Sequence, residues 1–137
     1  MNKLFQILDE VLPIELCHMI ISYTYAPQSI SLTTDIKNYC ATKADINKLY
    51  KDRLQDDADG WLSNDLIGYA NRNVATIFGL TDDFYVIFLK YIIQLKTREQ
   101  VDAYFITLLD KDLTVQINVM WGLFTVEDRA EFYDIMS

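Results

Sequence analysis

The sequence is poor in the residues that build turns. Its 137 residues include only four glycines and two prolines. A β-sandwich or β-barrel needs a turn about every ten residues, so this scarcity argues against the all-β classes. Apolar residues make up 51% of the chain and aromatic residues 13%, a composition far too hydrophobic for a disordered chain. We therefore expect a single all-α domain that spans residues 1–137.

Basic residues are also scarce. Twelve Lys and Arg face 20 Asp and Glu, which gives a formal net charge of −8, and no basic cluster offsets this balance. A protein that binds a phosphate backbone or an anionic membrane needs a basic face. Direct contact with nucleic acid or with a membrane surface is therefore not expected.

The acidic excess is concentrated near the end of the chain. Residues 99–137 hold eight acidic and two basic side chains, a net charge of −6. This segment is either a docking face for a basic partner or an ordinary solvated helix exterior, the commoner role for surface charge.

Cysteine and histidine are too few for most reactive centres. Cys17 and Cys40 lie among apolar neighbours without a C-x-x-C spacing, which is typical of small core residues in a reducing compartment. His18 is the single histidine, and on a helix it would point about 100° away from Cys17. We therefore predict no catalytic residue, no cofactor and no metal ion, and a protein that is not an enzyme.

The acidic pairs have structural explanations. If Gly60 is placed at the glycine position of an EF-hand loop, Gln55 and Leu66 occupy the two most important carboxylate positions, so calcium is not expected. Asp82-Asp83 and Glu127-Asp128 lie at predicted helix starts, where acidic side chains complement the helix dipole. No glycine-rich phosphate loop is present.

Long apolar runs are missing as well. The longest uncharged stretch, Leu16 to Thr34, is interrupted by Pro27, and Asp9 and Glu10 interrupt the first apolar residues. Neither a membrane span nor a signal peptide is expected.

Helical periods and caps recur from Leu4 to Met136 and predict a compact bundle of about seven or eight helices. Thr81, Thr97 and Thr125 are expected N-caps, whereas Thr42 could start a second helix within a longer one. The expected helices cover about 3–10, the stretch from 13 to 25, 36–54, 62–77, 82–95, 97–108, 113–121 and 125–136, with Gly79 closing the fourth.

The sequence pattern leaves the secondary structure of one segment and the position of another to be decided. Residues 113–121 alternate as a strand does, but they also fit a helical period, and helix is chosen because no second strand exists to pair with them. The stretch Phe84–Leu89 is apolar on every side, so its helix is expected at the centre. The aromatic residues are expected at core edges, with a protein interface as the alternative; they are Tyr23, Tyr25, Tyr39, Tyr50, Trp61 and Trp121.

The stretch Leu12-Pro13-Ile14-Glu15-Leu16, continued by Ile20-Ile21-Ser22-Tyr23, resembles the opening helix of an F-box, and places an F-box-like region at 12–54. The resemblance implies docking on an adaptor of ubiquitin ligases. It marks Leu12, Pro13, Leu16 and Ile20 as a protein interface. The Trp-containing second half of the F-box pattern is absent, and Thr24–Gln28 occupies the place of a short loop.

The whole chain is similar to uncharacterised small proteins of nucleocytoplasmic large DNA viruses. The similarity is carried by the Leu12–Leu16 start, 22–28, 35–50, 61–65 and 116–129. It implies a non-enzymatic accessory protein that binds a host or viral protein, in the host cytoplasm, with the nucleus or the virion as other locations. A structural or packaged virion component is the alternative, and an F-box-like adaptor-binding protein is the third. The oligomeric state cannot be read from these residues.

Overall fold

The computed structural model describes residues 30–137, and every regular element in that range is helical. The α-helices are α3 (Ile30–Leu54), α4 (Ala58–Ala70), α5 (Asp82–Tyr91), α6 (Arg98–Leu109), α7 (Leu113–Leu123) and α8 (Val126–Met136). Two short 3-10 helices, η1 (Gln55–Asp57) and η2 (Thr76–Phe78), lie between them. The all-α prediction is confirmed for this range. It holds fewer α-helices than the total predicted for the chain, because two of the predicted helices precede residue 30.

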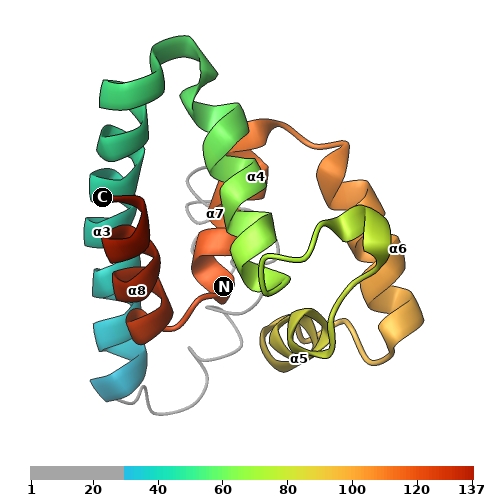
Figure 1. Ribbon diagram of the computed structural model, residues 1–137. Helices are drawn as coiled ribbons and strands as arrows, with labels where there is room; N and C mark the ends of the chain where they lie inside the picture. The colour runs from blue at the N-terminus through green and yellow to red at the C-terminus, as the bar shows by residue number, and fades with distance from the viewer. Residues whose placement is uncertain (1–29) are drawn as a thin grey trace.

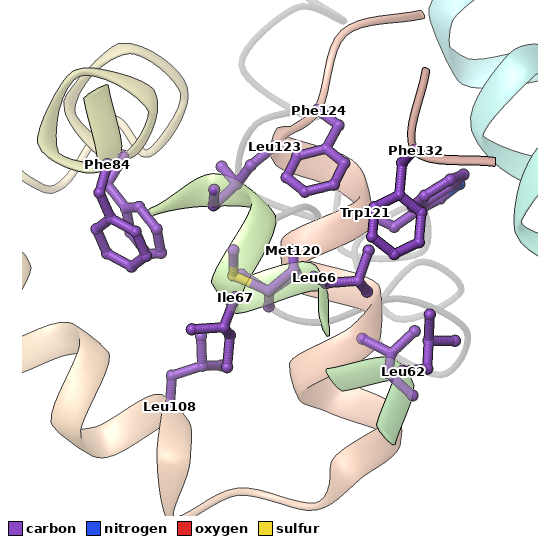
Figure 2. Close-up of a cluster of buried hydrophobic side chains, with 14 of the residues drawn as sticks. Leu62, Leu66, Ile67, Phe84, Leu108, Met120, Trp121, Leu123, Phe124 and Phe132 are labelled. Carbon is purple, nitrogen blue, oxygen red and sulfur yellow. The ribbon is translucent and has the colours of Figure 1, made fainter. Parts of the chain in front are cut away.

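The long helix α3 forms one side of the molecule (Figure 1). After η1 the chain reverses, and α4 runs back alongside α3 with α7 behind it. Helix α8 returns along α3, whereas α5 and α6 lie on the other side of α4. Buried side chains from all these helices form one hydrophobic cluster, part of which is drawn in Figure 2.

Helix α7 lies at the centre of this cluster. Every residue from Gln116 to Leu123 is buried, and α7 packs most extensively on α4. The central position predicted for Phe84–Leu89 is wrong: α5 buries Phe84 and Phe88, but Val86 on its outer face is 56% exposed. A helix that is apolar all round can still lie at the edge, because neighbouring helices decide which of its faces are covered.

Helix α7 carries polar residues, so its central position in the core is not evident from the sequence. Buried Gln116 accepts a hydrogen bond from the Ser63 hydroxyl at 2.7 Å. Its amide nitrogen donates to the carbonyl oxygens of Leu109 and Lys111 at 3.1 and 2.9 Å. The side chain thereby satisfies carbonyl groups at the end of α6, which removes most of the cost of its own burial.

The predicted N-caps are confirmed. The Thr81 hydroxyl accepts from the backbone N–H of Phe84, and Thr97 with Gln100 forms a capping box. Thr125 and Asp128 form a second box, with both hydrogen bonds present. The helix predicted over 113–121 is also confirmed, as α7.

Several predicted helix boundaries are wrong. The helix predicted over 62–77 ends at Ala70, because Arg72 and Asn73 take left-handed backbone angles, with φ of 55° and 60°. Helix α3 is not broken at Thr42, whose hydroxyl donates instead to the Asn38 carbonyl at 2.6 Å. The boundaries of α3, α4 and α5 also differ: α3 begins at Ile30, α4 begins at Ala58 within the acidic run, and α5 ends at Tyr91 rather than Leu95.

Burial corrects some predictions for single residues. Cys40 is exposed and is not a core residue, because it faces away from the cluster that its neighbour Tyr39 enters. Tyr50 and Trp121 are buried, whereas Trp61 is mostly exposed. Cys17, His18, Tyr23 and Tyr25 lie outside the described residues. In residues 99–137 the acidic side chains are largely exposed, which fits both a solvated helix exterior and a docking face for a basic partner.

Alkaline pH should destabilise the protein through Tyr69. Its ring packs on Phe124 and Phe132, its hydroxyl donates to Glu131 at 3.0 Å, and burial with this hydrogen bond raises its pKa from 10.0 to about 12. The neutral phenol is therefore favoured in the folded state. Stability is fully present below pH 10 and falls as the pH rises towards 12, because only the unfolded chain then loses this proton. Urea unfolding across this range should show a steeper fall for wild type than for Tyr69→Phe; equal slopes would contradict the assignment.

Candidate functional site

The interface residues predicted from the sequence lie outside the described residues. Leu12, Pro13, Leu16 and Ile20 all precede residue 30. Of the F-box-like region 12–54, the structure describes only α3. The candidate site lies within residues 30–137.

The most exposed large apolar side chains in that range belong to the 71–81 loop, which joins α4 to α5. Ile77 and Phe78, at the end of η2, are 87% and 83% exposed. We call this pair the apolar tip. Single exposed apolar residues are common on protein surfaces, but two large adjacent ones exposed this fully are typical of an interaction site.

Asn71 holds the 71–81 loop together from within. The side chain is fully buried, and its amide nitrogen donates to the carbonyl oxygens of Val74 and Gly79 at 2.8 and 3.1 Å. Its Oδ1 accepts from the backbone N–H of Thr81 at 2.7 Å. One side chain therefore joins the start, middle and end of the loop, and leaves the apolar tip on the outside.

The backbone supports the same shape. Asn73 donates to the Gly68 carbonyl at 2.7 Å, which closes α4, and Phe78 donates to Ala75 at 3.0 Å, which closes η2. Gly79 then has φ of +103°, a conformation that side chains with a Cβ rarely adopt. The exposure of the tip is thus a property of a hydrogen-bonded loop rather than of a loose one.

Charged side chains that flank the loop pair with each other. Arg72 forms an ion pair with Asp83, and Arg98 forms one with Asp82 at 3.0 Å. The hydrogen bond and the charge of Asp83 raise the pKa of Arg72. Because these charges are mutually compensated, the apolar pair is the distinctive feature of this surface.

No family model, curated protein or solved structure matches this chain. Within residues 30–137, no set of three His, Cys, Asp or Glu side chains is grouped as a metal site would require. No helix in that range combines the length and apolar character needed to cross a membrane. The loop geometry therefore carries the functional argument.

Sequence reasoning missed this site because it assigned Ile77 to the buried face of a helix. The Asn71-Arg72-Asn73 run does indicate the end of a helix, because asparagine tolerates left-handed backbone angles and often ends helices. What no pattern could show is that Asn71 is buried and bonded across the loop.

Proposed function

We propose that this chain is a non-enzymatic protein-interaction module whose apolar tip inserts into an apolar pocket of a host or viral protein. The observation that carries the proposal is the exposure of Ile77 and Phe78 on a loop held by the buried Asn71. An exposed apolar side chain gains roughly 25 cal/mol per Å² when a partner removes it from water. A preformed loop also loses little conformational entropy on binding, so more of that gain is retained as affinity.

We propose a viral accessory role in the host cytoplasm on the basis of the sequence resemblance alone, which points to proteins of nucleocytoplasmic large DNA viruses. A packaged or structural virion component is the alternative. The two are distinguished by the amount of this protein in purified particles, relative to known structural proteins. A high and constant copy number would favour the virion component.

The proposal predicts that Ile77→Ser combined with Phe78→Ser abolishes partner binding and leaves the fold intact. Both side chains lie in solvent, so their loss should change the free energy of unfolding by less than about 0.5 kcal/mol. A photo-crosslinker at position 78 first captures the partner in infected cells, and the crosslinked protein is identified. The purified partner is then titrated with wild type and with the double variant, and the two affinities are compared. The matched control is Ile106→Ser on α6, which removes another exposed isoleucine, 64% accessible, and should bind normally.

Two results would contradict the proposal. One is unchanged affinity of the Ile77→Ser, Phe78→Ser variant for the identified partner; the other is an equal loss in Ile106→Ser. A separate titration of wild type and Leu16→Asp with a purified ubiquitin-ligase adaptor tests the F-box-like alternative. Loss of adaptor binding by a variant that melts like wild type would favour docking through Leu12–Ile20, whereas a collapsed melting curve would place Leu16 in the core.

A further inference from the structure

Helix α6 leaves one of its faces uncovered. It packs mainly on α5 and α7 and lies at the edge of the molecule (Figure 1). Val101, Phe105 and Leu108 point into the core and are buried. On the opposite side, Ile106 is 64% exposed and Leu109 is 46% exposed. Two large apolar side chains therefore face solvent from a helix that already has a buried face.

Both side chains belong to one stripe along the outside of α6. Successive residues of an α-helix are turned by about 100°, so residues three and four positions apart are neighbours on its surface. Steps of three or four lead from Ile106 to Leu109 and Asp110 in one direction, and to the first turn of the helix in the other. All residues of this stripe are exposed. We call it the outer face of α6; it consists of Glu99, Asp102, Ala103, Ile106, Leu109 and Asp110.

The outer face of α6 carries negative charge without a cation of its own. None of its acidic side chains forms an ion pair within residues 30–137, although Asp102 accepts a hydrogen bond from the Tyr85 hydroxyl at 2.6 Å. Arg98 is the only basic residue of the helix; it pairs with Asp82 and lies over the Tyr85 ring on α5. Lys111, which follows the helix, has an interaction of its own. The negative charge of this face is therefore not compensated by an ion pair among the described residues.

This pattern differs from that of an ordinary solvated helix face. Such faces carry charges of both signs, which form ion pairs four residues apart. The solvent side of α3 has this arrangement, where Lys48 donates to Asp52 at 3.0 Å. On the outer face of α6, two exposed apolar side chains lie between acidic residues instead. A surface of this kind is complementary to a helix that carries an apolar stripe with Lys or Arg at its ends.

We propose that the outer face of α6 binds a basic amphipathic helix of a partner protein. Apolar side chains of that helix cover Ile106 and Leu109. Its Lys or Arg side chains lie opposite Glu99 and Asp102 at one end of the stripe and opposite Asp110 at the other. Helix α6 has 12 residues and a length of about 18 Å, so the contact is small and suits a reversible interaction. The proposal does not rest on the apolar tip, which is not part of this surface.

The experiment uses a synthetic peptide, held helical by a hydrocarbon staple, with leucine along one stripe and lysine at both ends of that stripe. The labelled peptide is titrated with the protein and followed by fluorescence anisotropy. It should bind saturably below about 1 mM. Raising the ionic strength from about 0.05 M to about 0.5 M should weaken this binding. A peptide with glutamine in place of each lysine should bind about fivefold more weakly, because the charge attraction is lost.

Four variants locate the binding surface. Ile106→Ser should weaken binding by about tenfold, because it removes an apolar side chain from the contact. The matched control is Val86→Ser on α5, which removes another exposed apolar side chain, 56% accessible, and should bind like wild type. Glu99→Gln combined with Asp110→Asn should reduce the salt dependence, whereas Asp134→Asn, at an exposed position on α8, should retain it. Melting curves without peptide show that each variant is folded.

The two proposed surfaces can be distinguished. Ile77→Ser combined with Phe78→Ser should bind the peptide as wild type does, and loss of binding there would place the peptide on the apolar tip and overturn the proposal. Three other results would overturn it as well: no saturable binding, equal binding of the lysine and glutamine peptides, or an equal loss in Ile106→Ser and Val86→Ser.

Discussion

Arg129→Ala should lower the free energy of unfolding by about 4 kcal/mol. The guanidinium is only 1% exposed and joins three helices. Its Nε donates to the Trp121 carbonyl at 3.1 Å, and Nη1 donates to the side chains of Asp35 and Asn38 at 2.7 and 2.9 Å. The group also lies over the Tyr39 ring, 5.5 Å from its centroid. Alanine removes all of these interactions and leaves a cavity between α3, α7 and α8.

Urea unfolding of two further variants separates packing from hydrogen bonding. Arg129→Met retains most of the volume and should lose about half as much stability as the alanine variant. Arg72→Met, which breaks only an exposed ion pair, should unfold within error of wild type. A loss below about 1 kcal/mol in Arg129→Ala would show that the buried guanidinium contributes little net stability.

Trp121→Ala should be comparably damaging, with a loss of about 4 kcal/mol. Trp121 is fully buried on α7 beside Phe124 and Phe132, both 5.9 Å away between ring centroids (Figure 2). Its indole N–H donates to the Thr42 hydroxyl on α3 at 3.1 Å. Alanine would leave a large cavity in the cluster that α3, α7 and α8 share.

Trp121→Phe tests how the loss divides between the ring and its hydrogen bond. Phenylalanine keeps most of the aromatic surface but leaves the Thr42 hydroxyl without this donor, so the expected loss is about 1–2 kcal/mol. Thermal melts with both variants check the ranking. A Phe variant as unstable as the Ala variant would mean that the indole hydrogen bond, rather than packing, dominates at this position.

The helical class, the choice of helix for 113–121 and the caps at Thr81, Thr97 and Thr125 were predictable from the sequence. These features depend on residues within four positions of each other. A hydroxyl that caps a helix meets its N–H partner three residues away whatever surrounds the helix. Local chemistry therefore determined where α5, α6 and α8 begin.

Tertiary structure alone decided which helix is central and which charge is buried. Phe84–Leu89 is the more apolar stretch, yet α7 is buried because Gln116 finds partners on α4 and α6, 53 and seven residues away. Arg129 belongs to an acidic segment that the charge pattern predicts to be solvated. Its ion pair with Asp35 on α3, 94 residues away, offsets the desolvation cost of burying the guanidinium. The apolar tip likewise depends on groups brought together only by folding. Burial is a property of the neighbours a residue acquires, and a linear pattern does not contain them.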